Sequence, residues 1–124
     1  MPVLLAIAVG GALGAVGRYG IAEAMSGLPT GPWPWPTLLV NILGAFAIGL
    51  VASSARVKRG PRWLPAFLIT GVLGGFTTVS ALALETGLLI EDGSAISGVL
   101  YFAATVVLGV FAVRLAMLTS RPAS

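Results

Sequence analysis

The chain has 124 residues, of which 57% are hydrophobic and 9% are charged, and it contains no cysteine or histidine. Its mean hydropathy of +1.02 lies far outside the range of soluble domains, so the sequence predicts an integral membrane protein. The lack of thiol and imidazole side chains excludes disulfides, cysteine nucleophiles and the usual zinc and haem sites. No candidate catalytic pair remains, and we predict no enzyme activity.

Four predominantly apolar stretches divide the chain. Each reaches the roughly 20 residues that a helix needs to cross the hydrocarbon core of a bilayer. The stretches cover about 3–25, 35–54, 63–90 and 96–118, with short connectors between them. Because the connectors leave no room for a soluble domain, we expect one all-α domain, residues 1–124, within the membrane.

Positive charge is concentrated in the second connector, which holds Arg56, Lys58, Arg59 and Arg62. The third connector is acidic, with Glu91 and Asp92, and the first carries no charge. Lys and Arg in short loops stay on the cytoplasmic side of a membrane. The pattern therefore predicts a multi-pass protein of the cell (inner) membrane with both termini in the cytoplasm, and gives no reason to expect nucleic acid as a partner.

The first span carries Gly10 and Gly14 at four-residue spacing, followed at the same spacing by Arg18. Small residues at this spacing are typical of close contacts between membrane helices. A charge inside a span costs about 2.5–3.5 kcal/mol on insertion scales and is expected to face protein or water. Arg18 either extends its side chain to the membrane surface or attracts anions near the outer side.

Two other spans carry polar residues four positions apart, so that the members of each pair share a helix face. The pairs are Thr37 with Asn41 and Tyr101 with Thr105. They could form hydrogen bonds that hold the helices together, with Tyr101 at the membrane interface and Thr105 bonded to its own helix. Alternatively, their hydroxyl and amide groups face a common lumen.

The third span contains the segment GVLGGFTTVSALALE at 71–85. One helix over 63–90 would be about 42 Å long, more than an untilted span requires. Glycine weakens helices and threonine can satisfy freed backbone groups, so we predict a break near 74–80, with the two glycines as part of its cause. Carbonyl groups that lose their helical hydrogen bonds there could bind a cation. N–H groups or hydroxyls at the break could bind an anion. Such backbone must be covered at membrane depth, so we expect a dimer.

Three segments resemble the signature segments of the Fluc-type (CrcB-like) fluoride channels. They are GGALGAVGRY at 10–19, TLLVNILGAF at 37–46 and GVLGGFTTVS at 71–80. The resemblance implies an antiparallel, dual-topology dimer of four-helix subunits that exports cytoplasmic fluoride passively. It also implies a structural sodium ion at the dimer centre, held by backbone carbonyls that map onto Gly74 and Thr77.

The same resemblance assigns residues to the pore. Arg18 matches a vestibule arginine and Asn41 a pore asparagine, and the polar track of the family maps onto Thr78, Ser80, Glu85, Tyr101 and Thr105. Thr37 joins this set because it shares the face of Asn41. Closely placed hydroxyl and amide donors suit fluoride, which gives up its water reluctantly. Val79 and Leu82 stand where the family usually has phenylalanine, whose ring edge can face an anion.

Three hypotheses follow for the function. The chain is a fluoride-conducting subunit, a non-conducting subunit of a heterodimeric channel, or a small proton-coupled multidrug exporter. The exporter is the least favoured, since it needs a carboxylate inside the membrane and the first span has Arg18 in its interior. An antiparallel homodimer needs copies that insert both ways, which the charge bias of the connectors opposes. Together with Val79 and Leu82, this bias favours a heterodimer with a paralogous chain.

Overall fold

The computed structural model describes residues 2–28, 31 and 33–120, which fold almost entirely into helices. The helices are α1 (Val3–Met25), α2 (Trp35–Ser53), α3 (Ala55–Arg59), α4 (Trp63–Pro65), η1 (Ala66–Leu73), α5 (Gly74–Phe76), α6 (Val79–Glu91) and α7 (Ala95–Thr119). Four stretches are long and apolar enough to cross a membrane, namely α1, α2, the run Trp63–Glu91 and α7. The all-α fold class with four membrane spans is confirmed, and the helix limits lie close to those predicted.

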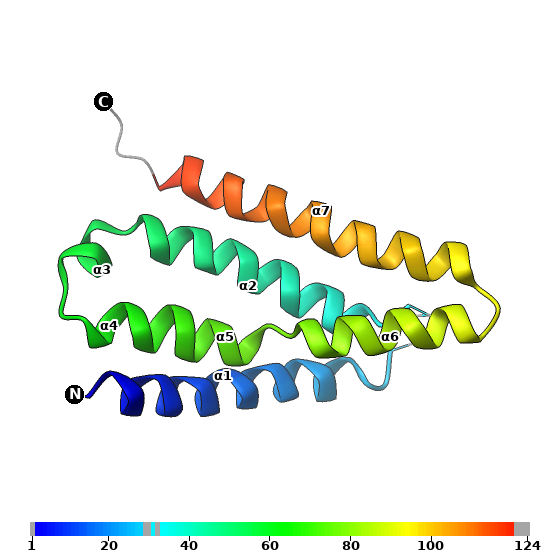
Figure 1. Ribbon diagram of the computed structural model, residues 1–124, viewed down its shortest axis with the longest axis horizontal. Coiled ribbons are helices and arrows are strands. Elements are labelled where there is room, and N and C mark those ends of the chain that lie inside the picture. The colour runs from blue at the N-terminus through cyan, green and yellow to red at the C-terminus, as the bar shows by residue number, and fades with distance from the viewer. Residues whose placement is uncertain (1, 29–30, 32, 121–124) are drawn as a thin grey trace.

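The four spans run lengthwise beside one another (Figure 1). α1 packs along η1 and α5, α2 packs along α7, and α6 packs on the N-terminal half of α7. The start of α1, α3 and the end of α7 lie at one end of the molecule, and the turn between α6 and α7 lies at the other. We call these the α3 end and the turn end.

Glycines allow α1 and the third span to approach each other closely. A Cβ at Gly10 would lie 2.9 Å from the backbone nitrogen of Val72, and one at Gly75 would lie 2.9 Å from Cα of Gly11. Both distances are shorter than a Cβ atom can approach a backbone atom, so a side chain at either glycine would force the two helices apart. The small-residue face of α1 is therefore its contact with η1 and α5. Close packing through small residues is typical of membrane helices, because the hydrophobic effect does not drive helices together in lipid.

The third span is interrupted at Thr77 and Thr78, whose backbones are extended at φ −83°, ψ 158° and φ −151°, ψ 119°. The interruption falls inside the predicted 74–80 segment. The helix passes through both glycines, however, and Gly74 keeps helical angles of φ −64°, ψ −39°. Gly75 serves packing, because it faces the backbone of Gly11. The eight residues of η1, which α5 separates from the break, form a wider π-helix, a conformation that often marks functional sites.

A small apolar core joins α2, α6 and α7. It is formed by Leu38, Leu82, Leu89 and Tyr101, and Trp33 packs against it. The tight turn between α6 and α7 places Gly93 at φ +86°, a conformation that favours glycine. This core fixes the second half of the third span beside α2, where the polar groups described below meet.

Replacing Gly14 by Ala should destabilise the protein, because a Cβ there would lie 2.8 Å from the backbone nitrogen of Phe76. Overpacking of this kind costs about 1–3 kcal/mol. Gly20→Ala on the same helix is the matched control, since no atom lies within 4 Å of a Cβ at that position. Thermal unfolding in detergent should place Gly14→Ala below the wild type and Gly20→Ala at or above it. Equal midpoints for the two variants would contradict the packing account.

Candidate functional site

Asn41, the only side-chain amide in the sequence, holds the break in the third span. Its Nδ2 donates to the Thr78 carbonyl oxygen at 3.0 Å, and its Oδ1 accepts from the Thr78 N–H at 2.8 Å. One side chain thereby satisfies both backbone groups of an extended residue. A carboxamide has two N–H groups, and the Thr78 carbonyl takes one of them, so the other can meet a ligand.

The break deprives the four backbone carbonyls of residues 74–77 of their usual helical donors, and two of those donors have new partners in the structure. In a continuous helix the Thr78 N–H would donate to Gly74, and the Ala81 N–H would donate to Thr77. Instead, the Thr78 N–H donates to Asn41, and the Ala81 N–H donates to Thr78 Oγ1 at 3.1 Å. Gly74 is also exposed on the surface of the chain. The carbonyls of Gly74 and Thr77 are therefore among the four that the break takes from the helical pattern.

A groove lined in part by polar side chains, called the polar groove below, runs beside the break, between α1 and the neighbouring spans. It has a volume of about 320 Å³ and is lined by Ala15, Arg18, Tyr19, Ala22, Thr37, Thr78 and Ala81. Ser80, which is exposed, lies next to it, with its Oγ 3.1 Å from Thr78 Oγ1. The structure thus brings Arg18, Thr37 and Thr78 to one site.

Glu85 joins three helices through its two carboxylate oxygens. Thr37 Oγ1 of α2 donates to Oε1 at 2.8 Å, and the Tyr101 hydroxyl of α7 donates to Oε2 at 2.8 Å. Tyr101 is completely buried, with an exposed fraction of 0%. The carboxylate therefore has a fixed orientation, and the bonds hold the bundle together as well as placing polar groups beside the groove.

Thr105 takes no part in this set of bonds. Its side chain is buried, and its hydroxyl donates to the Tyr101 carbonyl of its own helix at 2.8 Å. Of the two predicted roles for Thr105, hydrogen bonding to its own helix is therefore the one that the structure contains. This follows from the four-residue spacing, which places a threonine hydroxyl within reach of the carbonyl one turn earlier.

Val79 and Leu82, which replace the expected phenylalanines, face in different directions. The side chain of Val79 is 77% exposed and projects from the chain directly after the break. The side chain of Leu82 is 5% exposed and lies in the core with Leu38 and Tyr101. Leu82 therefore packs within its own subunit, whereas Val79 is available to whatever covers the break.

Trp33 and Ser97 support the Glu85 cluster through Tyr101, a contact that was not predicted from the sequence. The Trp33 indole N–H donates to Ser97 Oγ at 2.7 Å, and its ring lies edge-on to Tyr101 with centroids 5.7 Å apart. Trp33 thus packs on the tyrosine that donates to Glu85, on its side toward the turn end. Tryptophans near a span end usually suggest only an interfacial anchor, so no local pattern signals this contact.

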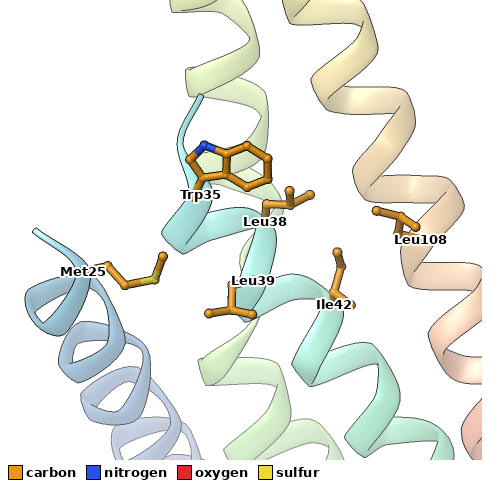
Figure 2. A pocket seen from close by; sticks show the side chains of 6 residues that line it. All are labelled: Met25, Trp35, Leu38, Leu39, Ile42 and Leu108. Atoms are coloured by element: carbon orange, nitrogen blue, oxygen red, sulfur yellow. The ribbon is translucent and has the colours of Figure 1, made fainter. Parts of the chain in front are cut away.

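A larger hollow of about 460 Å³ lies between α1, α2 and α7. Figure 2 shows the side chains that line it, which are Met25, Trp35, Leu38, Leu39, Ile42 and Leu108. The exposed lining of this hollow is apolar, so it has no polar group that could replace the hydration water of an ion. The smaller polar groove is therefore the candidate functional site.

The fold and the groove define a multi-pass membrane protein with a polar site beside a break in its third span. The chain belongs to the CrcB-like protein family, because the sequence model described as "CrcB-like protein, Camphor Resistance (CrcB)" matches residues 5–117.

Three relatives named "Fluoride-specific ion channel FluC" agree with this membership. The protein of Rhodospirillum centenum is 43% identical over 116 residues, which cover 89% of this chain and 88% of the relative. That of Hyphomonas neptunium is 41% identical, with 94% of each chain covered. That of Paracoccus denitrificans is 46% identical, with 88% of this chain and 86% of the relative covered.

Tyr101→Phe should destabilise the protein, because it removes the donor to Glu85 Oε2. Hydrogen bonds to charged groups contribute about 1.5–3 kcal/mol. Tyr19→Phe is the matched control, since Tyr19 is 65% exposed. Thermal unfolding should show a lower midpoint for Tyr101→Phe alone. A similar midpoint for both variants would mean that the bond to Glu85 contributes nothing to stability.

Proposed function

We propose that this chain is a subunit of a fluoride-selective channel through which cytoplasmic fluoride leaves the cell passively. The observation that carries the proposal is the groove beside the break, where Arg18, Thr37 and Thr78 come together. Membership of the CrcB-like family and the names of its relatives support fluoride as the ion. Passage of an ion down its gradient involves no catalysis, and no enzyme activity is assigned.

The groups at the groove suit a small anion that must lose its water. The Arg18 guanidinium supplies positive charge at the groove, and the hydroxyls of Thr78 and Ser80 supply donors next to it. The second N–H of Asn41 adds an amide donor at the break. The negative charge of Glu85 is offset by the two hydroxyls that donate to it, so it repels an approaching anion less than a bare carboxylate would.

A second subunit is needed to cover the break. Backbone that has lost its helical partners is tolerated at membrane depth only where protein or water covers it. Gly74, Val79 and Ser80 are exposed on this chain, so a single copy leaves the break open to lipid. We infer an antiparallel dimer in the cell (inner) membrane, with the two breaks facing each other. The basic connector supports an orientation of this chain with both termini in the cytoplasm.

A sodium ion at the dimer centre fits the groups that the break provides. Hard cations prefer oxygen ligands, and the carbonyls of Gly74 and Thr77 have lost their helical donors to Asn41 and Thr78. Within 2–28, 31 and 33–120, no three His, Cys, Asp or Glu side chains gather as a metal site, so carbonyls are the available ligands. The ion would be structural, because it joins the two breaks and is not transported.

The purified assembly should unfold at a higher temperature in sodium chloride than in the chloride of a bulky organic cation at the same ionic strength. Sodium that binds the folded assembly stabilises it by mass action, whereas a cation too large for the carbonyls does not. Raising the sodium concentration should raise the midpoint further. A midpoint that is the same in both salts would remove sodium from the proposal.

The partner that we propose is a paralogous chain with the opposite charge bias. Four basic residues in the second connector and two acidic residues in the third favour one insertion direction. Val79 projects from the break, so its aliphatic side chain meets the partner where the family usually offers an aromatic edge. The same feature supports the second candidate function, a non-conducting subunit that shapes the pore of its partner.

Fluoride efflux from liposomes tests the conducting role and the partner together. The chain should be reconstituted alone and with its paralogue, with chloride efflux as the control for selectivity and protease accessibility as the readout of orientation. We expect uniform orientation and little efflux for the chain alone, and selective fluoride efflux when the partner is added. A stable antiparallel homodimer that conducts fluoride unaided would overturn the heterodimer. The absence of fluoride efflux from the complete assembly would overturn the proposed function.

A further inference from the structure

The connector between α2 and α4 presents four positive charges from an ordered segment. Arg56, Lys58 and Arg59 of α3 and Arg62 after it are all exposed. Val57, between the first two, is 7% exposed and anchors α3 to the rest of the chain. Backbone hydrogen bonds fix the segment at three points, from Lys58 to Ser54, from Gly60 to Val57 and from Leu64 to Pro61.

The acidic residues of the chain lie away from this connector. Glu23, Glu91 and Asp92 lie near the ends of α1 and α6 that are closest to the turn end, and Glu85 is bonded within the bundle. Arg114 lies near the end of α7 and adds a further exposed cation toward the α3 end. Among residues 2–28, 31 and 33–120, the α3 end is therefore positively charged without a nearby Asp or Glu side chain to neutralise it.

The position of the connector places these charges at the membrane surface. α2 ends at Ser53 and the third span begins at Trp63, so the cationic segment starts and finishes where two spans leave the hydrocarbon. Tryptophan is enriched at the depth of the lipid headgroups. Clusters of Lys and Arg directly beside spans attract anionic lipids of the facing leaflet.

We propose that Arg56, Lys58, Arg59 and Arg62 form a binding site for the phosphate headgroups of anionic phospholipids. Their guanidinium and ammonium groups contact headgroups of the leaflet in which the α3 end lies, and so hold the inserted subunit at a fixed depth. This role is separate from topology, because the positive-inside rule acts during insertion, whereas lipid binding is an equilibrium property of the folded protein. It is also independent of fluoride passage.

Thermal unfolding of the purified protein in neutral detergent tests the site. Phosphatidylglycerol should raise the midpoint, and phosphatidylcholine of the same acyl chains should not. Because the attraction is electrostatic, the shift should shrink in high salt. Each neutralised residue should weaken binding roughly fivefold, so replacing all four by Gln should abolish the shift. Equal shifts with the two lipids, or an undiminished shift in the Gln variant, would overturn the proposal.

Two controls separate the alternatives. The charge-preserving variant Arg56→Lys, Arg59→Lys, Arg62→Lys should keep most of the shift, and it remains testable if the Gln variant fails to fold. Loss of the shift in a folded Lys variant would overturn a site that depends on charge. Glycerol phosphate without acyl chains, added at the same concentration, should leave the midpoint unchanged. A shift as large as that with phosphatidylglycerol would assign the site to free phosphates and overturn the lipid proposal.

Discussion

Backbone groups inside a membrane must find partners within the protein, and the break in the third span is where this constraint is hardest to meet. Asn41 meets it by bonding both the N–H and the carbonyl of Thr78. That solution has two consequences. The carbonyls of Gly74 and Thr77 lose their helical donors, and the Thr78 hydroxyl is fixed at the start of α6 beside the groove.

Two kinds of contact hold the halves of the broken span in place. The first half packs on α1 through glycine backbones. The two helices lie so close there that a side chain at these glycines would clash with the facing backbone. The second half is tied to α2 and α7 by Glu85, which accepts from Thr37 and Tyr101. Because each half has its own neighbours, the break can remain extended without loss of the bundle. The polar groups of the candidate pathway are thus also part of what stabilises the fold.

The spans could be predicted from the sequence because roughly 20 apolar residues suffice for a crossing, whatever they pack against. The break could be predicted only as a region. That the helix continues through Gly75 and ends just before Thr77 depends on how closely α1 approaches, which no local pattern contains. Spacing placed Thr37 and Asn41 on one face, but it could not show that they bind different partners, Glu85 and Thr78. The contact of Trp33 with Ser97 joins residues 64 positions apart.

The central claim, that fluoride passes beside a break held open by Asn41, is tested most directly by Asn41→Asp in the assembly that conducts. The variant loses the donor to the Thr78 carbonyl and places a carboxylate at the break, beside the proposed path of the ion. Thr86→Val is the matched control, because the Thr86 hydroxyl donates at 2.8 Å to Leu82 of its own helix. Fluoride efflux from liposomes should fall roughly tenfold or more for Asn41→Asp, the effect of losing about 1.5–3 kcal/mol, and stay near wild type for Thr86→Val. Unchanged efflux through Asn41→Asp would contradict the account.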